Sequence, residues 1–161
     1  MKTSARGFTL IELVIVITII AILAAIALPR YIAVQRDARV AKMQGVYGSI
    51  RTAAALAKAR CELDLAQGAT GAGTCGNATP QVTMDGAVVD MAFRYPAATA
   101  TGIQRAASID PAADGVTIST SGTTMTFTGN GASDAATCKI DYTAATSATT
   151  APTITIDTNG C

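Results

Sequence analysis

Residues 7–29 of the chain read GFTLIELVIVITIIAILAAIALP, an apolar run bounded by a glycine and a proline. From Phe8 to Leu28 the run has 21 residues and a single charge, the carboxylate of Glu12. As an α-helix it would extend about 31 Å, close to the roughly 30 Å hydrocarbon core of a bilayer. The stretch is therefore predicted to form a helix that can span a membrane.

Charge is arranged in blocks around this run. Lys2 and Arg6 precede it, residues 30–66 carry seven basic and three acidic residues, and residues 67–161 carry three basic and seven acidic residues. The positive-inside tendency puts the first seven residues in the cytoplasm and the rest of the chain outside, although the basic residues after the run oppose this orientation. The pattern predicts a basic tip, an apolar rod, a basic rod and an acidic head.

Composition excludes several classes of function. The 161 residues include no histidine, so histidine triads and histidine metal sites are ruled out. The net charge of +1 gives no case for nucleic-acid binding. We find no nucleophile-and-base pair and no phosphate-binding glycine loop, and we expect neither an enzyme nor a protein that needs a cofactor or metal.

Glu12 is the unusual residue of the apolar run, because a carboxylate at membrane depth costs roughly 2.5 to 3.5 kcal/mol. A cleaved secretory signal ending near Ala25-Ile26-Ala27 and a plain membrane anchor are the simpler interpretations, but neither explains a charge at this position. Cleavage between Gly7 and Phe8 would create an α-amino group four residues before Glu12. One copy's amine could then pair with a neighbour's carboxylate in a bundle of identical helices, which would fix the helix register.

The hexapeptide Gly7-Phe8-Thr9-Leu10-Ile11-Glu12, after a short basic leader and before an unbroken apolar helix, resembles the start of type IV prepilins. The resemblance implies that a membrane peptidase cleaves after Gly7 and methylates the new amino terminus on Phe8. It also implies that Glu12 guides subunit docking into a filament. Pro29 falls where these pilins have a helix-bending proline.

A second set of residues is similar to the major pilins of mannose-sensitive haemagglutinin pili. In that group a glycine is common before the Tyr-Pro pair, a position that Arg94 occupies here. The similar segments are Asp37-Ala38-Arg39, Gln44-Gly45-Val46, Phe93-Arg94-Tyr95-Pro96-Ala97-Ala98-Thr99 and Gly102-Ile103.

Beyond the apolar run, helical spacing of apolar residues predicts an amphipathic helix that stops near Gly68. The predicted apolar stripe is Ile32, Val40, Met43, Tyr47, Ile50, Ala54 and Ala57. Short strands follow, with hairpins around Asp85-Gly86 and Ser121-Gly122. They are Gln81–Met84, Ala87–Asp90, Gly115–Thr120, Thr123–Thr128, Thr137–Thr143 and Thr153–Asp157.

The predicted fold class is α+β, with the carboxyl-terminal half of a long helix packed on an antiparallel sheet. The expected segments are a leader at 1–7, a transmembrane or filament-core helix at 8–29, an amphipathic helix at 30–66 and a head at 67–161.

Four cysteines suggest disulfides in an oxidising compartment, and they allow three connectivities. Pairing of Cys61 with Cys75 would close the glycine-rich loop after the helix, while pairing of Cys138 with Cys161 would hold the last strands. The second loop resembles the carboxyl-terminal disulfide region of pilins, and this resemblance favours the nearest-neighbour pairs.

These observations together favour the structural major subunit of a type IV pilus, which would assemble with copies of itself into a surface filament. The expected partners are prepilin peptidase, the assembly machinery and the inner membrane, and the expected location is the inner membrane and then the cell surface. Two alternatives are a pseudopilin of a type II secretion system and a monomeric, membrane-anchored binding domain.

Overall fold

A computed structural model describes residues 8–76 and 78–161 of the chain. It has a long helix followed by two antiparallel sheets, which confirms the predicted α+β, type IV pilin-like architecture. The chain divides into two compact units at residues 38 and 39, and the second unit extends from Arg39 to Cys161. This boundary lies within the helix, so the head is built partly from helical residues.

Helix α1 runs from Leu10 to Ala66 and continues through Pro29. Because proline has no N–H, the carbonyl of Ala25 lacks its usual helical donor. Gly68, at φ +64°, caps the end of the helix. Its backbone N–H donates to the carbonyl of Leu65, and that of Ala69 donates to the carbonyl of Asp64. This is a Schellman cap, and it confirms the stop predicted at Gly68.

The first sheet has three strands in the order β1 (Gln81–Met84), β2 (Ala87–Ala92) and β3 (Tyr95–Pro96). Asp85 and Gly86 join β1 to β2 with φ values of +52° and +77°. Positive φ at both central residues is the mark of a type I′ hairpin turn. The hairpin was predicted, whereas the two-residue strand β3 was not.

The second sheet has four antiparallel strands in sequential order. Its outward rows are rich in threonine, serine and charged residues, and its inward rows carry apolar residues. The strands are β4 (Val116–Ser121), β5 (Thr124–Gly129), β6 (Lys139–Thr143) and β7 (Thr153–Asp157). Short helical segments connect the sheets and strands: η1 (Ala100–Gln104), α2 (Pro111–Asp114) and η2 (Ala135–Thr137).

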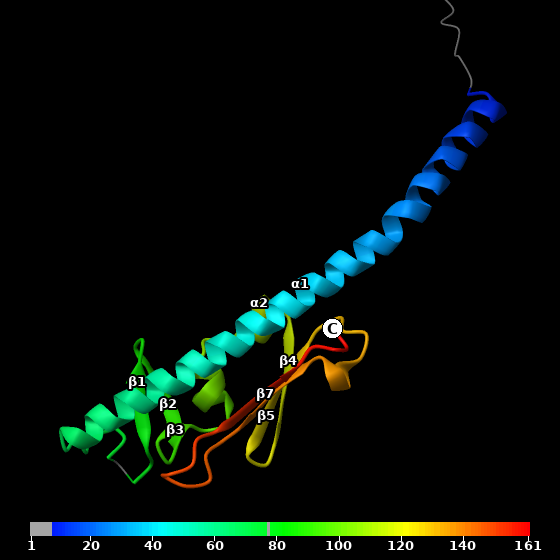
Figure 1. Ribbon diagram of the computed structural model, residues 1–161. Helices are drawn as coiled ribbons and strands as arrows, with labels where there is room; N and C mark the ends of the chain where they lie inside the picture. Colours follow the sequence, from blue (N-terminus) through cyan, green and yellow to red (C-terminus); the bar gives the residue numbers. More distant parts are fainter. Residues whose placement is uncertain (1–7, 77) are drawn as a thin grey trace, which may run out of the picture. The chain divides into compact units, whose positions relative to one another are not determined.

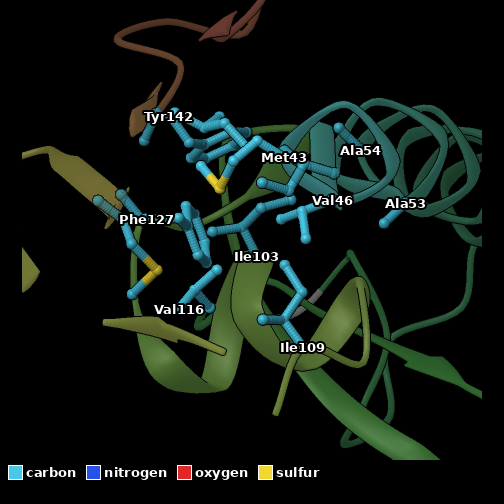
Figure 2. Close-up of a cluster of buried hydrophobic side chains, with 14 of the residues drawn as sticks. Met43, Val46, Ala53, Ala54, Ile103, Ile109, Val116, Phe127 and Tyr142 are labelled. Atoms are coloured by element: carbon cyan, nitrogen blue, oxygen red, sulfur yellow. The ribbon is translucent and has the colours of Figure 1, made fainter. Parts of the chain in front are cut away.

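The main hydrophobic core lies between α1 and the four-stranded sheet. Figure 2 shows Met43 and Val46 of the helix together with Phe127 and Tyr142 of the strands. Four residues of the predicted apolar stripe are buried, and Val46 and Ala53 join them although the spacing argument missed both. The four are Met43, Ile50, Ala54 and Ala57.

Ile32 does not belong to that stripe, because it is 56% exposed. It lies in the amino-terminal unit, where every described residue through Ala38 is exposed. Helical spacing alone could not show where packing against the sheets begins.

A second cluster of buried apolar residues lies between the helix and the three-stranded sheet, at a different place along α1 (Figure 1). Each cluster contains its own disulfide. Cys61 is joined to Cys75 in the smaller cluster, and Cys138 to Cys161 in the main core. These are the pairs that the sequence analysis favoured.

Candidate functional site

The amino-terminal unit has no buried residue among its described residues, 8–38. The large apolar side chains from Phe8 to Val34 have exposed fractions between 43% at Val14 and 80% at Leu10. An 18-residue window of α1 has a mean hydropathy of 3.0, and none of that window is buried. By length and composition, this helix could cross a membrane. Exposed apolar surface of this extent marks a site for lipid or protein contact.

Glu12 lies in the first turn of this helix and is held there by Thr9. The backbone N–H of Glu12 donates to the Thr9 hydroxyl oxygen at 3.3 Å, and that hydroxyl donates to the Glu12 carboxylate at 3.4 Å. Thr9 precedes the first helical residue, so the two residues occupy the positions of a capping box. A carboxylate in the first turn also interacts favourably with the helix dipole.

Apolar side chains flank this cap. Phe8, Thr9, Leu10 and Leu13 line one open hollow at the start of the helix. Phe8 precedes the cap and Leu13 is the fourth helical residue, which are the two positions of a hydrophobic staple. The helix start therefore has a defined local structure that places Phe8 one turn before the Glu12 carboxylate.

Asp90 and Tyr142 of the head make hydrogen bonds that join separate elements. The Thr101 hydroxyl and then the Gln81 amide donate to the Asp90 carboxylate, and these hydrogen bonds lower the pKa of Asp90. Burial raises the pKa of Tyr142, whose hydroxyl donates to the carbonyl of Pro96 at 2.6 Å. No group of three cysteine, aspartate or glutamate side chains in residues 8–76 and 78–161 could hold a metal ion.

The structure places the predicted site residues in separate parts of the chain. Gly7, the predicted cleavage position, lies outside the described residues. Phe8, Glu12 and Pro29 belong to the amino-terminal unit, while the four cysteines belong to the second unit.

Sequence reasoning missed two residues of interest. The Thr-x-x-Glu spacing of Thr9 and Glu12 was a readable capping signal. Asp64 is 1% exposed, pairs with the Nε of Arg60 at 3.1 Å and accepts from the backbone N–H of Cys75 at 3.3 Å. Nothing in the sequence distinguishes it from a surface aspartate.

Comparison with known proteins gives matches that cover part of the chain. Residues 2–28 match the family model of the prokaryotic N-terminal methylation motif. The chain is 49% identical over 53 residues to the type IV major fimbrial protein FimA of Dichelobacter nodosus, which is 33% of this chain and 34% of that protein. The identity is also 49% over 53 residues with the type IV narrow pilus major component PilA5 of Thermus thermophilus, of which 46% is covered.

The chain thus spans about a third of the length of the FimA relatives it matches. No solved structure matches it. The methylation motif of type IV prepilins is present, and the similarity to type IV major pilins extends over a third of the chain.

Proposed function

We propose that this chain is the structural major subunit of a type IV pilus, made as an inner-membrane precursor and polymerised through its amino-terminal helix into a surface filament. One observation supports this most directly: an apolar helical segment with no buried residue and with a single carboxylate in its first turn. Lipid would solvate this helix before assembly, and the helices of neighbouring copies would solvate it afterwards.

Processing would supply the positively charged partner for the Glu12 carboxylate. A prepilin peptidase would cut between Gly7 and Phe8 and methylate the new α-amino group. The charged amine of one copy would then lie against the Glu12 carboxylate of a neighbour. Because an unpaired carboxylate in an apolar bundle is costly, only packings that form this pair would be stable. Thr9 supports the pairing, since its hydroxyl holds the carboxylate at the helix start.

The chain would therefore have four functional segments. Residues 1–7 are the leader, residues 8–29 form the membrane and filament-core helix with a bend at Pro29, residues 30–66 carry the helix into the head, and residues 67–161 complete the head. The assembly machinery of the inner membrane would move the processed chain from lipid into the filament.

Within the pilins, we infer a relationship to the major subunits of mannose-sensitive haemagglutinin pili. The shared segment from Phe93 to Thr99 forms the β2–β3 turn, strand β3 and the approach to η1. An added Cβ at Gly102 would lie 2.2 Å from the carbonyl oxygen of Ala97. Gly102, which belongs to the similar pair Gly102-Ile103, therefore lies where a side chain has no room.

The test combines intact mass with filament yield. The mature wild-type chain should begin at methylated Phe8 and should be recovered in sheared extracellular filaments. Glu12→Ala should enter the membrane and be cleaved, yet give little or no filament. Asp37→Ala is the matched control, because it removes an exposed carboxylate from the same helix and should leave the yield near that of the wild type.

Other outcomes would identify the alternatives. A mature chain that begins at Leu28 would indicate a secretory signal, and a monomer that retains residues 1–7 would indicate an anchored binding domain. Processed chains that never form extracellular fibres would indicate a secretion pseudopilin. Normal filament yield from Glu12→Ala would contradict the proposed pairing.

A further inference from the structure

A small basic hollow lies at the start of the second unit. It has a volume of about 160 Å³, room for about five water molecules at roughly 30 Å³ each. None of its lining residues is acidic. The basic hollow is lined by Arg39, Lys42, Met43, Gly115, Gly129 and Asn130.

Hydrogen-bond donors converge on this hollow from two elements. The Nε of Arg39 donates to the backbone oxygen of Cys161, the last residue of the sequence, at 2.6 Å, which orients the guanidinium. The Oδ1 of Asn130 accepts from the Thr117 hydroxyl at 2.7 Å, so its amide nitrogen is left to donate. No aspartate or glutamate among the described residues forms an ion pair with Arg39 or Lys42.

The ammonium group of Lys42 has a defined place. An added Cβ at Gly115 would lie 2.8 Å from the Nζ of Lys42, and Gly115 has φ +57° at the end of α2. Because Gly115 has no side chain, there is room beside it for the Lys42 ammonium group. Lys42 also lines a neighbouring hollow with Asp114, whose carboxylate accepts from the backbone N–H of Asp110 at 3.0 Å and forms no ion pair with Lys42. The basic hollow is consequently suited to a single oxyanion brought from outside.

A carboxylate of this chain is exposed elsewhere on the same unit. Asp85 is the first residue of the β1–β2 turn, and in the view of Figure 1 that turn projects past the ribbon of α1. Asp85 shares a hollow with Arg105, but Arg105 donates to the carbonyl of Val88 and forms no ion pair among the described residues. The turn thus presents an unpaired carboxylate at the tip of a hairpin.

The two features cannot meet within one copy. The hollow that includes Asp85 is bordered on α1 by Leu56, and the basic hollow is bordered by Lys42. These helix positions are 14 residues apart, which corresponds to about 21 Å at a rise of 1.5 Å per residue. An ion pair needs an approach within about 4 Å.

We propose that the Asp85 turn of one copy docks in the basic hollow of a second copy, with its carboxylate between Lys42 and Arg39. Complementary sites at separate positions on one unit make a heterologous contact, which propagates as an open helix when the rotation does not close a ring. The inference rests on the proposed function, and it adds to the amino-terminal helix a second, charge-selective contact between heads. The opposite net charges of residues 30–66 and 67–161 fit such a contact.

Chemical cross-linking of intact wild-type filaments tests the contact directly. A carbodiimide, which joins an amine and a carboxylate without a spacer, should link the Nζ of Lys42 to the side chain of Asp85. Because the two groups are too far apart within a copy, the linked peptide would report a contact between copies. Links from Lys42 only to Asp114 or to other carboxylates would overturn the proposal.

Charge variants give a second, independent test. Lys42→Glu and Asp85→Asn should each lower filament yield at least about tenfold, the effect of losing one good charge contact. Asp85→Asn keeps a residue that tolerates positive φ, so the turn should still form. Combining Lys42→Glu with Asp85→Lys should recover much of the yield. Arg51→Glu is the matched control, because it reverses an exposed charge of the same helix outside the basic hollow, and its yield should stay within about twofold of the wild type.

The outcomes separate this inference from the proposed function. Three results would overturn the inference: normal yield from both single variants, no recovery in the combined variant, or an equal loss of yield in Arg51→Glu. In each case wild-type filaments would still support the pilin assignment. If the wild type forms no filaments, both fail together. Thermal unfolding of each variant shows whether the head is intact, and a variant that unfolds leaves the decision to the wild-type cross-link.

Discussion

Polar contacts of individual side chains join buried parts of the head. Tyr142 is fully buried in the main core, yet its hydroxyl reaches the carbonyl of Pro96 at 2.6 Å. Asp64 is buried beside the Cys61–Cys75 disulfide and ties the helix to the loop that follows it. In both cases one side chain joins segments that are separate in sequence, so removing it leaves a buried partner unsatisfied.

Tyr142→Phe should lower the free energy of unfolding by about 1–3 kcal/mol, since the buried carbonyl of Pro96 loses its donor. Denaturant unfolding of the full chain in detergent measures this change. The matched control is Tyr31→Phe, which removes the hydroxyl of a tyrosine that is 60% exposed. It should change stability by less than about 0.5 kcal/mol. Equal effects of the two variants would show that the Tyr142 hydroxyl contributes nothing specific.

For single residues, the sequence showed which side chains are chemically unusual better than it showed which become buried. Glu12 could be singled out because a charge in an apolar run is costly wherever the run lies. Its link to Thr9 followed from the Thr-x-x-Glu spacing and could have been found. Asp64 could not, because its burial depends on how the loop closes over the helix end.

The secondary-structure elements were largely predictable from short-range signals. Asp85-Gly86 predicted the first hairpin, and the alternation of apolar residues predicted all four strands of the second sheet within two residues of their observed bounds. Strand β3 was missed because two residues have no readable period. The division into separate sheets depends on where each hairpin packs along α1, which no local pattern encodes.

Turns offer a sensitive test of these elements. Gly122 connects β4 to β5 with φ +57°, and an added Cβ would meet no atom there. Gly122→Ala should therefore cost about 1–2 kcal/mol from left-handed backbone strain alone. Gly71→Ala is the control, because this glycine also has open space around it but no positive φ. It should be neutral or slightly stabilising in the same unfolding measurement. A neutral Gly122→Ala would mean that the turn adopts another conformation.

On the scale of the whole molecule, two functions are assigned to different parts of the chain. The described residues through Ala38 are exposed and add nothing to the folded core, while residues 39–161 contain both buried clusters. Under the proposed function, changes that impair assembly through the amino-terminal helix should therefore leave folding of the head intact. The sequence predicted an apolar rod over residues 8–29 and an apolar stripe that begins at Ile32, whereas the first buried residue of the helix is Met43.

Removal of one disulfide should loosen one sheet and leave the other protected. Cys61→Ala with Cys75→Ala should cost roughly 3 kcal/mol by the chain-entropy estimate for a loop with a sequence separation of 14. Hydrogen exchange should rise in β1, β2 and β3 and change little in β4–β7, because each sheet packs in its own cluster. The reverse pattern is expected for Cys138→Ala with Cys161→Ala. Uniform loss of protection in either variant would show that the head unfolds as one cooperative unit.

The separate anchoring of the two sheets has an evolutionary consequence. A lineage under pressure to change its exterior, for instance to escape antibodies or phage, could replace the residues of one hairpin while the opposite sheet preserved its fold. Diversity among descendants of this chain should then accumulate in patches that coincide with one cluster at a time. The helix packs in both clusters and, in the proposed filament, would also contact neighbouring copies, so it would change most slowly.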